Sequence, residues 1–337
     1  MAKKVIVYAI CKNEEKHAAR FMHSMKEADG VYVLDTGSQD NSAKTLSSLG
    51  ANVKRSSVSP WRFDAARNTA LSLVPEDADI CVCADLDEVF SKGWRRKLES
   101  AWGEKTQRAR FRYVWSVLPD GSEGTVLYLD KIHVRHGYEW RYPVHEALIR
   151  TDGRAENPDE TAYVPDMTLF HYPDPGKSRS DYLPLLELAV SENPLDARCI
   201  HYLGREYMYA GKWKKCISAL RAHVSLPSSM WREEKSASYR YMARAHIALG
   251  QTAAAENALF SAIAQAPHLR EPYFEMAKLL LHLGDAPGAY SMILRAIRIR
   301  QRPDCYVSEE EAWGDEAESI LLSSKQRIIA EFSDIPV

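Results

Sequence analysis

The chain has 337 residues, which is enough for two domains with buried cores. Its net charge is −2 with 27% charged residues, so it lacks the overall basic character of a polyanion-binding protein, although a local basic surface is not excluded. No stretch approaches the roughly 20 apolar residues that span a bilayer, and the apolar stretch at 5–10 is too short for a secretory leader. Six scattered cysteines without metal-ligand spacing indicate reduced thiols, so we expect a cytoplasmic protein without a membrane span.

Short apolar runs alternate with amphipathic segments in the first half of the chain. This pattern predicts strands at 5–10, 30–34, 51–55 and 80–84, and helices at 14–26, 42–49 and 65–73. The order of these elements predicts a mainly parallel, doubly wound sheet with right-handed crossovers. Further strands are expected at 109–118, 125–134 and 147–149. With these later strands added, we expect residues 1–180 to form an α/β domain with a Rossmann-like mixed sheet.

Two acidic residues follow the apolar run at 80–84. Side chains in a strand alternate between faces, so Asp85 and Asp87 are expected to project from the same face where the strand reaches the surface. Carboxylates at this edge of an α/β sheet suit Mg²⁺ or Mn²⁺ that bridges phosphate oxygens. The alternative is that the two residues only begin a loop.

Polar residues also follow the first two predicted strands. Asn13 and Glu14 come after 5–10, at the crevice where nucleotides bind in open α/β sheets. Asp35 ends the second strand and can accept hydrogen bonds from a base or a ribose, while Gly37 permits a tight turn. The structural alternatives are a helix N-cap for Asn13 and a turn-forming role for Asp35.

Arg67 lies one residue before Asn68, at the head of the helix that precedes the acidic strand. A guanidinium there can bridge diphosphate oxygens, with Asp64 orienting it. An ordinary surface ion pair is the alternative.

A local basic run occupies 92–112. It contains Lys92, Arg95, Arg96, Lys97, Lys105, Arg108, Arg110 and Arg112, against only Glu99 and Glu104. This run indicates either a solvated helix face or a contact surface for an anionic donor or acceptor.

Helix-forming residues dominate from about residue 181. Three segments in this half end at Gly211, Gly250 and Gly284, spaced 39 and 34 residues apart. Each unit then closes with a proline, at Pro227, Pro267 and Pro303. This spacing and punctuation are typical of tetratricopeptide helix pairs, which stack into a solenoid with a concave face. We expect an all-α repeat domain at 181–337, with an unrelated helical bundle as the alternative.

The first half resembles the family 2 glycosyltransferases of the GT-A fold, the nucleotide-diphospho-sugar transferases. The resemblance covers roughly residues 4–180, and the chain is similar to the subgroup that appends tetratricopeptide repeats and includes sublancin-type peptide S-glycosyltransferases. Four motifs carry it, at 10–15, 34–40, 63–68 and 84–88.

The resemblance implies a metal-dependent, inverting transfer of a sugar from a UDP-sugar. Asp85 is expected to contact the ribose, and Asp87 to ligate Mn²⁺ or Mg²⁺ together with His171, a better match than His145. Glu146 is the candidate general base, with Asp120, Asp130 and Glu139 as rivals. The residues expected to bind the nucleotide sugar are Cys11, Asn13, Glu14, Asp35, Gly37, Ser38, Asp64, Arg67, Asn68 and Asp85.

The acceptor is left open by the sequence. A peptide or protein side chain presented by the repeats comes first, a glycan second, and a modified nucleic-acid base third; the repeats would alternatively mediate a homodimer. Two other classes compete with the transferase. One is a non-catalytic tetratricopeptide adaptor with a degenerate sugar-nucleotide fold. The other is a nucleotidyltransferase, which usually has a Gly-rich basic loop where this chain has Cys11-Lys12-Asn13-Glu14-Glu15.

Overall fold

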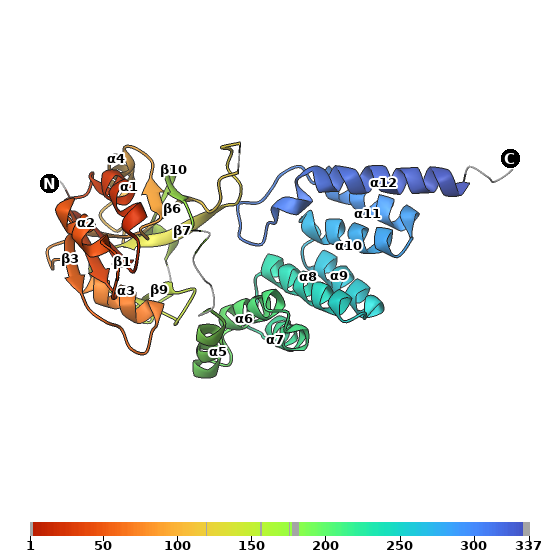
Figure 1. Ribbon diagram of the computed structural model, residues 1–337, viewed down its shortest axis with the longest axis horizontal. Coiled ribbons are helices and arrows are strands. Elements are labelled where there is room, and N and C mark those ends of the chain that lie inside the picture. The colour runs from red at the N-terminus through yellow and green to blue at the C-terminus, as the bar shows by residue number, and fades with distance from the viewer. Residues whose placement is uncertain (1–2, 119, 156, 175, 177–181, 333–337) are drawn as a thin grey trace. The chain divides into compact units, whose positions relative to one another are not determined.

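The computed structural model describes residues 3–118, 120–155, 157–174, 176 and 182–332. The chain divides into two compact units, Met1–Arg179 and Ser180–Val337, and each is described here by itself (Figure 1). None of the described helices has both the length and the apolar character that a membrane crossing requires. All six cysteines are free thiols, and five of them are buried.

The first unit contains an eight-stranded sheet, helices on both faces and a two-stranded hairpin. Its elements are β1 (Val5–Cys11), α1 (Glu15–Met25), β2 (Gly30–Asp35), α2 (Ser42–Ser48), β3 (Asn52–Arg55), α3 (Phe63–Leu71), β4 (Ile80–Cys83), β5 (Glu88–Phe90), α4 (Trp94–Ala101), β6 (Arg108–Val114), β7 (Val126–His133), β8 (Tyr138–Arg141), β9 (Ala147–Arg150), the 3₁₀ turn η1 (Pro158–Glu160) and β10 (Thr161–His171).

The strand order of the large sheet is β3-β2-β1-β4-β7-β6-β10-β5. Strands β1 to β4 are parallel, as the βαβαβαβ pattern predicts, but β7 runs antiparallel to both β4 and β6. The expectation of a mainly parallel sheet is therefore wrong beyond β4, and the fold class of a mixed α/β sheet is confirmed. The sequence pattern did not predict three of the strands, namely the short β5 and β8 and the long β10.

The sheet has a hydrophobic core on each face, because successive side chains of β1 point in opposite directions. Val5, Val7 and Ala9 pack in one core with residues of α1, α2 and α4. Ile6 and Tyr8 pack in the other with α3 and the β8–β9 hairpin. Helix α3 is thereby fixed beside the ends of β1 and β4.

A buried hydrogen-bonded chain links β1, β7 and β8 in the second core. Trp140 Nε1 donates to the Tyr8 hydroxyl at 2.7 Å, and this hydroxyl lies 2.9 Å from His133 Nε2. His133 Nδ1 lies 2.7 Å from the carbonyl oxygen of Val134, which can only accept, so the ring proton is on Nδ1 and Nε2 accepts from Tyr8. Burial lowers the pKa of His133 to about 3, and the ring is neutral in the folded protein.

We expect this histidine to destabilise the first unit in mild acid. The pKa of His133 is about 6.5 in the unfolded chain and about 3 in the folded chain. Between these two pH values the unfolded chain therefore binds a proton that the folded chain does not. The free energy of unfolding should therefore fall by about 1.4 kcal/mol per pH unit, or about 2 kcal/mol between pH 6.5 and 5. Hydrogen exchange of β1 and β4 amides measures it. His133→Gln should flatten the slope, and the exposed His136→Gln should not; equal slopes in both variants would contradict the assignment.

The second unit is helical throughout. Its elements are α5 (Tyr182–Glu192), α6 (Ala197–Tyr209), α7 (Trp213–Ser225), α8 (Arg232–Ala248), α9 (Thr252–Gln265), α10 (Glu271–His282), α11 (Ala286–Arg298), the 3₁₀ turn η2 (Glu310–Ala312) and α12 (Asp315–Phe332). Helices α6–α7, α8–α9 and α10–α11 form three successive pairs (Figure 1).

Glycine and proline punctuate these pairs as predicted. Gly211, Gly250 and Gly284 follow α6, α8 and α10 with φ of 66°, 70° and 87°. This left-handed conformation commonly ends a helix, and glycine adopts it without steric strain. Gly204 has a packing role instead, because a Cβ there would lie 2.3 Å from the Leu220 side chain. The helix-repeat prediction is confirmed.

Candidate functional site

The candidate site lies where three parallel strands end. β1 pairs with β2 on one side and β4 on the other, so Cys11, Asp35 and Cys83 close their strands at one edge of the sheet. Ligands bind at this edge in open α/β sheets. The sequence motifs that follow these three strands are therefore brought together.

The loops after β1 and β2 are tied to each other by hydrogen bonds. Asn13, in the left-handed region with φ 57°, donates its N–H to Ser38 Oγ at 2.9 Å and accepts from the N–H of Gln39 at 2.8 Å. The N–H of Glu14 donates to Ser42 Oγ at 2.7 Å. Burial raises the pKa of Cys11 to about 11, so its thiol is not an ionised nucleophile. Asn13 is therefore not the N-cap of α1. It ties the loop after β1 to the loop after β2, and these hydrogen bonds together are called the clasp.

Asp35 is fully buried beneath this clasp. Its Oδ1 accepts from the N–H groups of Gly37 at 3.3 Å and Ser38 at 2.9 Å, and Gly37 has φ 112°. Its Oδ2 has no hydrogen bond from the part of the chain that the structure describes and lies 3.2 Å from Nε of Arg55, whose side chain is 65% exposed. The long, exposed side chain of Arg55 can be displaced, and a hydrogen-bond donor of a ligand can then take its place at this oxygen.

The two aspartates after β4 do not extend the strand. β4 ends at Cys83, and Asp85 and Asp87 lie in the turn before β5, so the expectation that strand alternation places them on one face is wrong. Leu86, between them, is buried. The two carboxylates have different partners.

Asp85 is held by Arg67. Arg67 Nη1 and Nη2 lie 2.8 and 3.1 Å from the two Asp85 oxygens, and Nε of Arg67 pairs with Glu146. The guanidinium stacks on Trp140 with 5.2 Å from Cζ to the ring centroid, and its side chain is 6% exposed. Burial opposes ionisation of Asp85, but Arg67 and Lys131 together hold its pKa well below the usual range. Asp85 is thus a permanently ionised acceptor.

Two neighbours of Arg67 have other roles than expected. Asp64 pairs with Arg62 through contacts of 3.0 and 2.8 Å, so the prediction that it orients Arg67 is wrong. Asn68 both donates to the carbonyl of Trp140 and accepts from its N–H, each at 2.8 Å. Asn68 therefore fastens β8 to α3.

Lys131 was not singled out by the sequence. Its Nζ lies 3.1 Å from Asp85 Oδ2 and 3.0 Å from Glu88 Oε1, and Glu88 is 1% exposed. Burial opposes the charge, but Asp85 and Glu88 raise the pKa of Lys131. Burial raises the pKa of Glu88, while Lys131 lowers it. No local motif marks Lys131, because only the antiparallel insertion of β7 beside β4 brings it here.

Asp87 meets His171. β5 and β10 pair so that His171 lies opposite Glu88, and His171 Nε2 is 3.6 Å from Asp87 Oδ2. Both side chains are largely buried, and His171 Nδ1 is 3.1 Å from the carbonyl of Trp115. The Trp115 ring lies 4.7 Å from the imidazole, centroid to centroid, at a tilt of 32°. A carboxylate oxygen and an oriented imidazole form two ligands that a divalent cation accepts.

Glu146 sits at the end of a strained loop. Tyr142 and His145 have φ of 82° and 51°, a conformation that costs a non-glycine residue of the order of 1 kcal/mol or more and clusters at functional sites. The loop also docks on α3, since the N–H of Phe63 donates to the carbonyl of Pro143 at 2.9 Å. The strain positions Glu146 against Arg67.

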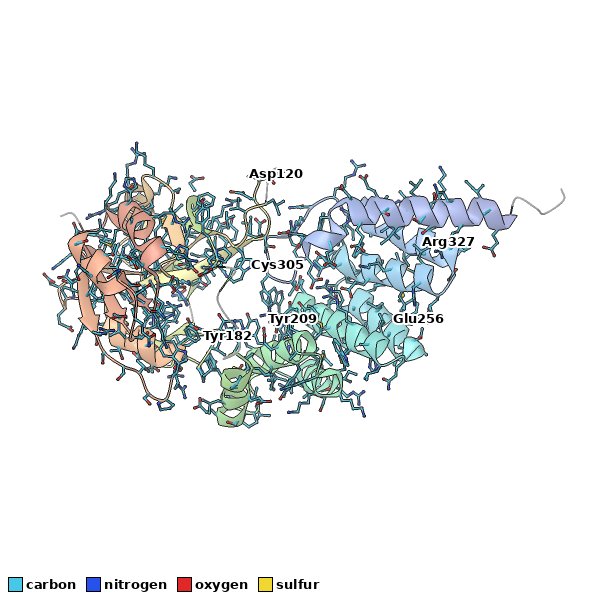
Figure 2. The ribbon with its side chains drawn as sticks, viewed as in Figure 1. Asp120, Tyr182, Tyr209, Glu256, Cys305 and Arg327 are labelled. Carbon is cyan, nitrogen blue, oxygen red and sulfur yellow. The ribbon has the colours of Figure 1, made fainter. Side chains whose placement is uncertain are left out.

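The three rivals of Glu146 lie elsewhere. Asp130 pairs with Arg110 at 3.5 Å. Glu139 pairs with Arg141 at 2.6 Å. Asp120 caps the exposed turn between β6 and β7 by binding Ser122 (Figure 2).

The basic run at 92–112 is divided between α4 and β6. Arg95 pairs with Asp29 and Glu99, and Arg112 pairs with Glu123. Arg108 is buried, with Nη2 3.1 Å from the carbonyl of Asp130. The run is thus neither one helix face nor one unpaired cationic surface.

The sequence comparison agrees with the arrangement of the first unit. Residues 6–135 match the family model described as "Glycosyl transferase family 2". The matched residues run from β1 to just past the end of β7, so they include the strand ends that carry the candidate site. No curated protein matches the chain.

Solved structures resemble parts of the chain at low identity. The type III secretion chaperone SycD of Yersinia enterocolitica, in complex with a peptide of the translocator YopD, is 17% identical with a TM-score of 0.33, covering 38% of this chain and 92% of its own. MamA is 18% identical with a TM-score of 0.33, over 48% and 99%. The first TPR of Spaghetti (RPAP3), bound to an HSP90 peptide, is 17% identical with a TM-score of 0.32, over 39% and 94%.

Proposed function

We propose that the protein is a metal-dependent, inverting glycosyltransferase that moves a sugar from a UDP-sugar to a nucleophilic acceptor. The observation that carries the proposal is the approach of Asp87 and His171 to 3.6 Å at the strand edge, beside the ionised Asp85; the two aspartates lie within the matched residues 6–135. The antiparallel pairing of β5 with β10 brings this carboxylate and this imidazole together from distant parts of the chain.

The nucleoside is assigned to the strand ends. Asp35 accepts from the base through Oδ2 once the exposed Arg55 moves aside, and Asp85 accepts from the ribose hydroxyls. The N–H groups and polar side chains of Asn13, Glu14, Gly37 and Ser38 line the same edge. The clasp keeps these loops fixed before the donor arrives, which reduces the ordering cost of binding.

Asp87 and His171 are assigned to the divalent cation. Their donor set of one carboxylate oxygen and one imidazole nitrogen fits Mn²⁺ or Mg²⁺ that takes its other ligands from water and diphosphate. The bound ion would neutralise charge on the departing diphosphate. Lys131 forms ion pairs with Asp85 and Glu88, so its positive charge balances part of the negative charge at the site before the ion binds.

Glu146 is assigned as the base that takes the proton of the acceptor. A direct displacement needs one carboxylate near the acceptor nucleophile. The ion pair with Arg67 orients Glu146, and the strained loop holds it with about 11% exposure. The acceptor class is a peptide or protein side chain first, because stacked helix pairs form surfaces that bind peptides, and a glycan second.

Calorimetric titration of UDP and then of a panel of UDP-sugars, with and without Mn²⁺, tests the function. We expect binding that requires Mn²⁺ and slow release of free sugar from one donor, which identifies that donor. A folded protein that binds none of the UDP compounds would overturn the proposal and favour the adaptor.

A matched pair of variants tests the base. Glu146→Gln keeps the shape and can still accept from Arg67, so UDP binding should persist while transfer falls by roughly 10²-fold or more. Glu139→Gln, at an exposed ion pair, should leave transfer unchanged. Retention of anomeric configuration in the product would contradict the inverting mechanism.

A further inference from the structure

The helical unit contains a buried cluster of metal-binding side chains that the transferase site does not use. His201 on α6, His223 on α7 and Glu234 in the first turn of α8 offer ligand atoms that all lie within 4.8 Å of one another. Both histidines are fully buried and Glu234 is 9% exposed. Burying ionisable side chains is costly unless they are paired, so the contacts that they make with each other and with their neighbours determine what the cluster can bind.

Two serines and a tyrosine surround the cluster. Ser238 Oγ lies 2.7 Å from His201 Nδ1 and 2.9 Å from His223 Nδ1, so one hydroxyl contacts the same nitrogen of both rings. His223 Nε2 lies 3.2 Å from Glu234 Oε1 and 2.9 Å from Ser229 Oγ. The Tyr306 hydroxyl donates to the other Glu234 oxygen.

Where each ring carries one proton, the hydrogen-bond partners determine which nitrogen holds it. An ionised carboxylate only accepts, so His223 Nε2 carries the ring proton and His223 Nδ1 accepts from the Ser238 hydroxyl. His201 Nδ1 must then donate to Ser238, which leaves His201 Nε2 unprotonated. In this arrangement His223 Nε2 donates its proton to Glu234, and His201 keeps one unprotonated ring nitrogen.

We propose that His201, His223 and Glu234 bind one divalent transition-metal ion, with Zn²⁺ as the ion that two imidazoles and one carboxylate favour. When the ion binds, the proton of His223 moves from Nε2 to Nδ1, and both Nδ1–H groups donate to the two lone pairs of Ser238 Oγ. This is the outer hydrogen bonding that orients imidazole ligands in metal centres. The carboxylate supplies one negative charge, and Ser229 or a water completes the coordination.

The ion would have a structural role. Its ligands come from α6, α7 and α8, so it crosslinks the first helix pair to the first helix of the second pair. Tyr306 extends the contact to the segment that precedes α12. Metal binding that occurs only in the folded chain adds directly to stability.

Metal content of the full chain tests the proposal. The measurement uses an Asp87→Asn, His171→Asn background, so that the proposed donor-site cation is not counted. We expect about one Zn²⁺ per chain after dialysis and an unfolding midpoint that rises by roughly 5 °C or more on adding Zn²⁺. Adding His223→Gln should weaken Zn²⁺ binding roughly tenfold or more, whereas His282→Gln, at an exposed histidine on α10, should not.

The visible absorption of Co²⁺ bound to the background chain gives a second readout, which needs no substitution in the cluster. Co²⁺ held by nitrogen ligands in a four-coordinate site absorbs strongly in the visible, and Zn²⁺ should displace it. If the background chain binds neither ion and its midpoint does not move, or if His223→Gln folds and binds Zn²⁺ as well as the background, the proposal is overturned. The cluster would then be a hydrogen-bond network only.

Discussion

Replacing Asp87 with alanine is expected to abolish the Mn²⁺-dependent part of UDP binding and to lower sugar transfer by about 10³-fold or more. The substitution removes the carboxylate that lies 3.6 Å from His171 and leaves one protein ligand. The fold should persist, because the contact between β5 and β10 at this point uses the backbone: the N–H of Tyr172 donates to the carbonyl of Asp87 at 2.9 Å. Calorimetry of UDP with and without Mn²⁺ measures the effect.

A matched control lies at the opposite end of the same strand. Asp79 is exposed just before β4 and accepts from the N–H of Lys4 at 2.6 Å. Asp79→Ala removes a carboxylate from β4 without touching the strand edge that carries the site, so UDP binding should be unchanged. His171→Asn should weaken the Mn²⁺ dependence as Asp87→Ala does. Wild-type affinity in Asp87→Ala would refute its role as a ligand.

The predictable parts of this molecule are those with local signals. Alternation and punctuation identify β1 to β4, and the polar residues at their ends follow from strand order alone, because parallel neighbours end at one edge. The glycines after α6, α8 and α10 likewise identify the repeats, since only a left-handed cap needs them.

The unpredictable parts depend on contacts between distant segments. Lys131 meets Asp85 only because β7 inserts antiparallel next to β4, and nothing in its own segment indicates this. His171 was expected as a ligand from family resemblance, but β10, which ends at His171, gives no clear periodicity because half-buried and exposed residues mix along it. The partner of Asp64 was missed for a related reason, since Arg62 and Arg67 both lie within reach along the chain and only packing decides between them.

Replacing Arg67 with methionine is expected to destabilise the first unit by about 3 kcal/mol, because it leaves two largely buried carboxylates without their main partner. The control is Arg141→Met, which removes an arginine whose side chain is 55% exposed from its ion pair with the exposed Glu139 and should cost less than about 1 kcal/mol. Hydrogen exchange of the β1 and β4 amides reports both. Adding Glu146→Gln to Arg67→Met should recover part of the loss, since Asp85 keeps Lys131.

The same variant separates two roles for Arg67 in donor binding. If Arg67 bridges the diphosphate, Arg67→Met weakens UDP while uridine binds as before. If Arg67 instead acts by holding Asp85 against the ribose, the affinities for uridine and for UDP fall by the same factor, because the lost contact is to the nucleoside. The four hydrogen bonds that already occupy the guanidinium, to both Asp85 oxygens, Glu146 and the Cys83 thiol, favour the second outcome. A loss confined to UDP would show instead that the guanidinium leaves these partners when the donor binds.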